Sequence, residues 1–222
     1  MGVGMFASVD LYCERLGPEF WAEPVNAITN LVFVMAGLWG VVASRRNGSG
    51  RFVEVLGWWV VAIGVGSFLF HTFADRMTIW LDIVPIATLV VVYAFFALHR
   101  FAGYGATASA AILVGFLVVS GVLTLLVPDS LRIATNNTTG YLPAFLAMLV
   151  FGALCLWRGS HAGWYLLAAG AIFVLSAACR VADPVVCDTF PVGTHFLWHV
   201  LNGAMLWVVL AAAVRFGRPA SA

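Results

Sequence analysis

Long apolar stretches alternate with short polar connections along the whole chain. A transmembrane helix needs roughly 20 mostly apolar residues, and seven stretches of about that length follow one another. The connections between them carry charges and helix breakers, as in Pro128-Asp129-Ser130. The pattern therefore predicts an all-α integral membrane protein, a single seven-helix domain over residues 1–222 with a short extramembrane segment at 1–25. The predicted helices cover residues 26–44, 53–73, 79–98, 106–127, 141–157, 162–181 and 194–215.

Composition supports the membrane interpretation and excludes one class of partner. Hydrophobic residues make up 63% of the chain and charged residues 9%, whereas soluble domains are nearer half apolar and a quarter charged. The net charge is +1 and there is no basic run, so nucleic-acid binding is not expected. No obligate protein partner can be inferred.

The basic residues, all of them Arg, predict the orientation in the membrane. Positive charges favour the cytoplasmic side. The connections after the first, third and fifth predicted helices, together with the C-terminal tail, hold seven of the 11. We therefore expect the N-terminus outside and the C-terminus in the cytoplasm.

Polar residues on three predicted helices fall at one depth under this topology. Ser67 and His71 lie near the outer end of the second helix, and Asp82 lies near the outer start of the third. His195 and His199 lie at the outer start of the seventh helix. Residues four apart share a helix face, so each of the two pairs presents both of its side chains in one direction. Ionisable groups at bilayer depth are costly and therefore functional candidates.

These residue types suit metal-assisted hydrolysis. Three imidazoles, from His71, His195 and His199, leave a tetrahedral zinc ion one open position for water, whose pKa falls toward ~7 on such a metal. Asp82 could take the water proton and return it to the leaving group, and Ser67 could hydrogen-bond the developing oxyanion. At bilayer depth the natural substrate is a lipid, so we expect the site to cut an acyl bond near the outer leaflet.

Each residue also has a plain structural interpretation. A single membrane histidine often joins two helices by a hydrogen bond. Ser67 could bond its own i−4 carbonyl, and Asp82 could be a helix N-terminal acid that interacts with the dipole.

A polar stripe accompanies the candidate site. Glu23, Asn26 and Asn30 stand at i, i+3 and i+7, and Asn202 shares a face with His195. Such a stripe should face the bundle interior. It either lines the cavity above the zinc or packs helices together through interhelical hydrogen bonds.

The spacing of these residues resembles a known family. SxxxH, then Asp eleven residues after the His, then HxxxH in the last helix resembles the alkaline ceramidases. These belong to the heptahelical membrane hydrolase superfamily that includes the progestin and adiponectin receptors. The stretch Tyr12–Leu31 and Val186-Cys187-Asp188 resemble ceramidase segments as well. The resemblance implies hydrolysis of the ceramide amide to sphingoid base and fatty acid. It also implies zinc ligands and water-assisting residues at the positions inferred above: His71, His195, His199, Ser67 and Asp82.

The resemblance also implies a calcium site near the N-terminus. Animal alkaline ceramidases bind calcium through acids near the N-terminus. Glu14 and Glu23 stand at the positions of two of these acids. The first acid is displaced to Asp10, and Leu16 stands in place of a polar ligand. These acids therefore either bind calcium or form a solvated acidic rim.

The four cysteines divide by topology. Cys13 and Cys187 fall on the predicted outer side, where disulfides persist, and the family resemblance implies that they pair. Cys155 and Cys179 are expected to be buried free thiols.

Alternative functions remain at this point. One is a receptor-like lipid-binding protein with a zinc site, and another is a hydrolase of a different acyl lipid. A third alternative is a haem carrier. Haem needs axial ligands on opposite faces of the macrocycle, and three histidines at one depth fit this requirement poorly.

Overall fold

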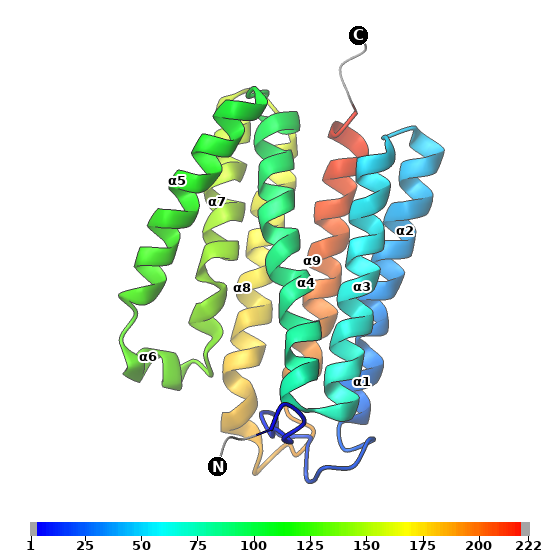
Figure 1. Cartoon of the computed structure of the whole chain (residues 1–222), viewed down its shortest axis with the longest axis vertical. Helices are drawn as coiled ribbons and strands as arrows, with labels where there is room; N and C mark the ends of the chain where they lie inside the picture. Colours follow the sequence, from blue (N-terminus) through cyan, green and yellow to red (C-terminus); the bar gives the residue numbers. More distant parts are fainter. Residues whose placement is uncertain (1–3, 219–222) are drawn as a thin grey trace.

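The helices of the computed structural model, which describes residues 4–218, run side by side through one bundle (Figure 1). Within this part of the chain, seven helical spans are long and apolar enough to cross a membrane, which confirms the predicted count. The helices are α1 (Pro24–Thr29), α2 (Leu31–Asn47), α3 (Arg51–Phe73), α4 (Arg76–Phe96) with the π-turn Ala97–Phe101, α5 (Ala106–Leu125), α6 (Asp129–Ala134), α7 (Leu142–Trp157) after the 3₁₀ turn Thr138–Tyr141, α8 (Ala162–Val186) and α9 (His195–Phe216).

The ends of the spans differ from the predicted ones for local reasons. The first span is two helices, α1 and α2, joined at Asn30. Helix α4 begins three residues earlier than predicted because the Asp75 carboxylate accepts from the backbone N–H of Thr78 at 2.8 Å, and the Thr78 hydroxyl reaches back to the Asp75 N–H. Helix α8 continues past residue 181 as far as Val186, so it carries Asp183 within a span.

Small residues let the backbones of α2 and α3 approach each other. A Cβ placed on Gly37 would lie 2.6 Å from the Gly57 carbonyl oxygen, and one placed on Gly57 would lie 2.9 Å from that of Gly37. Close glycine contacts are a usual means of packing helices in lipid, where burial of apolar surface between helices gains little. Helix α5 stands at the opposite edge of the bundle (Figure 1), and most of its side chains are exposed toward the surroundings.

The N-terminal segment, residues 4–23, folds across one end of the bundle, where α3 ends and α4 and α9 begin (Figure 1). Its backbone bonds to the α3–α4 turn, through Val9 N–H to the Ala74 carbonyl at 2.8 Å and Met77 N–H to the Met5 carbonyl at 3.1 Å. A disulfide joins Cys13 to Cys187 just after α8, which confirms the pairing that the family resemblance implied.

The other two cysteines, Cys155 and Cys179, are free thiols in the structure, as expected. Cys155 is buried and Cys179 is half-buried, so burial holds fully for the first only.

Candidate metal centre

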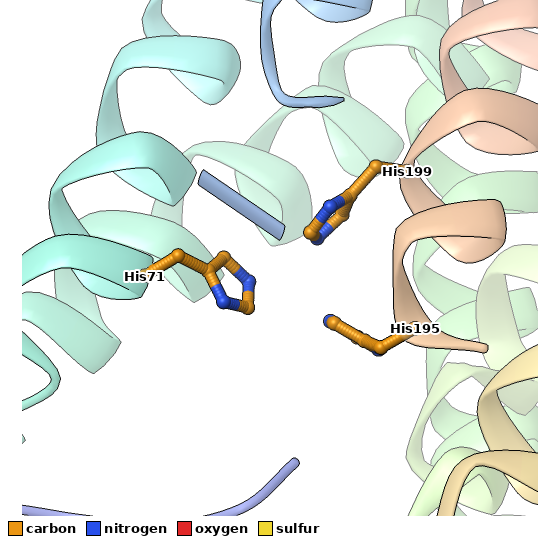
Figure 2. A group of neighbouring side chains, drawn as sticks. All are labelled: His71, His195 and His199. Atoms are coloured by element: carbon orange, nitrogen blue, oxygen red, sulfur yellow. The ribbon is translucent and has the colours of Figure 1, made fainter. Parts of the chain in front are cut away.

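Three buried histidine rings meet at the covered end of the bundle. His71 comes from the last turn of α3, and His195 and His199 come from the first two turns of α9; Figure 2 shows the three rings pointing toward one another. One ring nitrogen from each lies within 4.8 Å of the others, and none of the three residues is more than 2% exposed. The convergence expected from helix topology is therefore present.

In two of these rings the other nitrogen, Nδ1, already makes a hydrogen bond. Nδ1 of His71 lies 2.6 Å from Glu23 Oε2, and Nδ1 of His199 lies 3.0 Å from Thr29 Oγ1. A carboxylate only accepts, and the Thr29 hydroxyl donates to the Val25 carbonyl at 2.8 Å, so both Nδ1 atoms carry the proton. This leaves the Nε2 lone pair of each ring free, as in metal-ligating histidines that donate their other N–H to an oxygen.

The third ring contains a buried polar atom that no other group satisfies. Nδ1 of His195 has no hydrogen-bond partner within residues 4–218. A buried nitrogen without a partner is costly, and a metal ion is one group that can engage it. Neutral imidazole is a usual zinc ligand. These three residues therefore fit a bound metal ion.

Glu23 connects the N-terminal segment to the His71 ring. Its second carboxylate oxygen pairs with the Arg15 guanidinium, and Asn26 Nδ2 donates to Oε2 at 3.1 Å. Arg15 also donates to the His71 carbonyl at 3.1 Å. Burial alone would raise the pKa of Glu23, but the hydrogen bonds from His71 and Arg15 outweigh it and hold the pKa below its ordinary value. Glu23 is therefore a carboxylate that orients the ring, a role the sequence did not suggest for it or for Arg15.

Tyr12 and Asp183 orient the start of α9. The Tyr12 ring stacks on the His195 ring with centroids 3.6 Å apart and planes 15° apart. The fully buried Asp183 accepts from the backbone N–H groups of Thr194 at 2.7 Å, His195 at 2.9 Å and Cys13 at 3.2 Å. A carboxylate at a helix N-terminus satisfies free N–H groups and interacts favourably with the helix dipole.

Ser67 and Asp82 lie together beside the histidines because α3 and α4 touch there. Pro85 has no N–H, so the Leu81 carbonyl four residues earlier lacks its helical donor. Gly66 packs against that oxygen so closely that a Cβ would lie 2.1 Å from it. The next residues on each helix, Ser67 and Asp82, then stand side by side and line the same cavity as two of the histidines.

This cavity extends from the polar end into the apolar interior of the bundle. It is lined mainly by apolar side chains of α3, α4, α7, α8 and α9. Along α4 and the start of the π-turn that follows it, the lining runs from Asp82 to Ala97, a helical distance of about 22 Å. The arrangement suits a long hydrocarbon chain whose polar end stops beside the histidines.

The polar residues predicted beside the candidate site differ in whether they line this cavity. Asn202 lines the cavity. Asn26 and Asn30 are buried outside its lining, and Asn30 Nδ2 donates to the Asn26 carbonyl at 2.9 Å. This bond is local to the first span and joins no other helix, so the role of these two residues stays a prediction.

The acids of the expected calcium site are engaged separately. Glu14 accepts from the backbone N–H groups of Val25 and Asn26 at 2.7 and 2.8 Å, capping α1 from outside the helix. Burial raises its pKa, and those hydrogen bonds act in the opposite direction. Asp10 is exposed. Among the described residues, the set of acids, cysteines and histidines close enough to share an ion is the three histidines. Calcium binding by Asp10, Glu14 and Glu23 stays a prediction.

The fold and the site together define a multi-pass membrane protein with a buried three-histidine centre at the end of an apolar cavity. The chain belongs to the Ceramidase family, whose sequence profile matches residues 8–218, nearly the whole length. A comparison with curated proteins gives no match. Family membership supports a membrane hydrolase of ceramide-like lipids and confirms the resemblance noted in the sequence.

Proposed function

We propose that this chain is a zinc-dependent hydrolase that cleaves the amide bond of ceramide or a related N-acyl lipid. One observation carries the proposal: three buried imidazoles with free nitrogens meet beside Ser67 and Asp82 at the end of an apolar cavity. The family supports the substrate class. The products are a fatty acid and a sphingoid base or another amine.

His71, His195 and His199 would hold the ion. A zinc ion held by three imidazoles acts as a Lewis acid that polarises an acyl carbonyl and lowers the pKa of water toward ~7. The residues around it keep the ligand rings oriented: Glu23 and Thr29 hold two Nδ1–H groups, and Tyr12 covers the third ring.

Asp82 and Ser67 supply the proton transfer and the hydrogen bond. An Asp82 carboxylate oxygen accepts a proton from the attacking water and returns it to the amide nitrogen as the C–N bond breaks. The Ser67 hydroxyl donates to the oxygen that becomes negative in the tetrahedral transition state. The apolar lining excludes bulk water and holds the acyl chain, so the scissile amide is presented at the polar end.

The substrate would enter from the bilayer, and the site would lie toward the outer leaflet. The Arg distribution supports an outer N-terminus. The three histidines lie where α3 ends and α9 begins, the end of the bundle that the N-terminal segment crosses (Figure 1).

Metal analysis and lipid assays test the proposal. Purified protein should contain about one zinc per chain, and a panel of N-acyl lipids and acyl esters should show chelator-sensitive hydrolysis of the amides. His199→Ala should lose both metal and activity, whereas His161→Ala, near the opposite end of the bundle, should lose neither. Undiminished hydrolysis by the His199→Ala protein would rule out the metal mechanism.

A further inference from the structure

A guanidinium stands at the polar end of the cavity, and the hydrolysis described above does not use it. Arg180, on α8, lines the cavity together with Asp82 and His195. Charged groups inside a membrane bundle are costly and normally paired. The contacts of Arg180 therefore need an explanation.

Aromatic rings surround this guanidinium in place of an acid. Its central carbon lies 5.4 Å from the ring centroid of Tyr12, 5.8 Å from that of Tyr141 and 5.4 Å from that of Trp198. Cations bind to the faces of such rings. Within residues 4–218 no carboxylate oxygen lies within 4.0 Å of it.

Most of its hydrogen-bonding capacity is unused. Nη1 donates to the Tyr12 hydroxyl at 2.7 Å, and the buried Nε has no partner among the described residues. Arginine carries five N–H donors, so the side chain presents a charged fork with free donors to the cavity. A buried donor without an acceptor is unfavourable, which favours a ligand that supplies one.

Among residues 4–218, no acidic group neutralises the charge by contact. Tyr12 contributes its ring face and its hydroxyl oxygen, which accepts from Nη1. Tyr141 and Trp198 contribute ring faces. Asp82 lines the same cavity but forms no ion pair with Arg180.

We propose that Arg180 binds a carboxylate of the lipid ligand. The planar fork of arginine matches the two oxygens of a carboxylate, and a lipid whose acyl chain fills the apolar cavity places the groups next to its amide beside this fork. The carboxylate has two sources. It belongs either to the amine part of the substrate, as in an N-acyl amino acid, or to the fatty acid released by hydrolysis; the first source rests on the proposed function.

Two amides that differ in one group test the first source. N-oleoylglycine carries a carboxylate next to the amide, and N-oleoylethanolamine carries a neutral hydroxyl there. Arg180→Gln should lower kcat/KM for the glycine amide about 10–150-fold, the equivalent of about 1.5–3 kcal/mol for a hydrogen bond to a charged group. The ethanolamide should change less than about threefold, because it has no carboxylate to pair with the guanidinium fork.

Fatty-acid binding tests the second source without any need for turnover. Radiolabelled oleate bound to the purified protein should be displaced by unlabelled oleate and far less by oleyl alcohol. Arg180→Gln should weaken oleate binding by the same 10–150-fold. If neither amide is hydrolysed by the unaltered protein, the proposed function fails on these lipids, and this binding measurement still decides the assignment of Arg180.

Two further variants keep the test open to failure. Arg132→Gln removes an exposed Arg of α6 and should behave as the unaltered protein in both measurements. Arg180→Lys keeps the charge without the planar fork and should give an intermediate loss even if the Gln variant does not fold. A loss confined to the glycine amide assigns the substrate carboxylate, and a loss confined to oleate assigns the product. Unchanged oleate binding together with equal effects on both amides overturns the proposal.

Discussion

Glu23 Oε2 lies 2.6 Å from His71 Nδ1, although 48 positions separate the two residues in the chain. The carboxylate fixes the proton of the ring on Nδ1 and turns Nε2 toward the other two histidines. The N-terminal segment thus controls the orientation of a ring carried by α3.

Glu23→Gln should weaken zinc binding by about 10–100-fold, the usual effect of removing an oxygen that orients a metal-ligating histidine. The amide keeps an acceptor but loses the charge that both His71 and Arg15 engage. Competition with a zinc-binding dye measures the change. Glu19→Gln alters an exposed acid of the same segment and should leave the affinity as it was. Equal affinities for the two variants would contradict the assignment.

The disulfide should stabilise the site because it anchors the segment that carries Tyr12 and Arg15. Reduction is expected to shift the electrophoretic mobility, Cys13→Ser should abolish that shift, and either change should lower the free energy of unfolding by about 2–4 kcal/mol. Electrophoresis and thermal unfolding in detergent check both effects. Cys179→Ser, which alters a free thiol, should preserve the mobility difference, and its loss in that variant would argue against the Cys13–Cys187 pairing.

Asp183→Asn should destabilise the start of α9. Asp183 Oδ1 accepts from the backbone N–H groups of Thr194 and His195, and Oδ2 accepts from that of Cys13. An amide offers one accepting oxygen in place of two, so at least one of these N–H groups loses its acceptor. We expect a loss of about 1–3 kcal/mol in unfolding free energy, as for a buried donor left unpaired. Asp188→Asn changes a more accessible acid nearby and serves as the control in the same thermal melts. A melting temperature equal to that of the control would show that the carboxylate is dispensable.

The sequence predicts the convergence of the three histidines because these residues interrupt apolar helices. His71, Asp82 and the HxxxH pair stand out against hydrophobic neighbours, and helix length together with connectivity brings them to one depth. The same reasoning gives the seven spans, since hydropathy needs no tertiary information.

The residues that orient the centre were not predicted because their roles come from contacts distant in sequence. Thr29 meets His199 across 170 positions, and Cys13 meets Asp183 across the same separation. Asp183 was assigned to a connection because the sixth span was expected to end at residue 181. Arg180 contributed only to the count of charges, since nothing in the local pattern reveals the rings around it.

Gly66→Ala should separate Ser67 from Asp82. Its methyl group would lie 2.1 Å from the Leu81 carbonyl oxygen, so α3 and α4 must move apart, at a cost of about 1–3 kcal/mol for an overpacked contact. A misplacement of about 1 Å in catalytic groups lowers turnover about 100-fold, and we expect kcat to fall more than KM changes. Gly121→Ala on α5 meets no atom within 4 Å and should retain full activity in the lipid assay. Full activity in both variants would show that this close contact does not position the pair.

Ala147→Phe should shorten the acyl chain that the protein accepts. Ala147 lines the middle of the cavity, so a phenyl ring there blocks the space beyond it while leaving the polar end unchanged. Excluding about four methylenes, at ~0.8 kcal/mol each, corresponds to a change of about 200-fold in preference for short over long chains. Rates on N-acyl lipids of graded chain length measure this shift. Val150→Phe, at an exposed position of the same helix outside the lining, should keep the original preference. An unshifted profile for Ala147→Phe would mean that the acyl chain lies elsewhere.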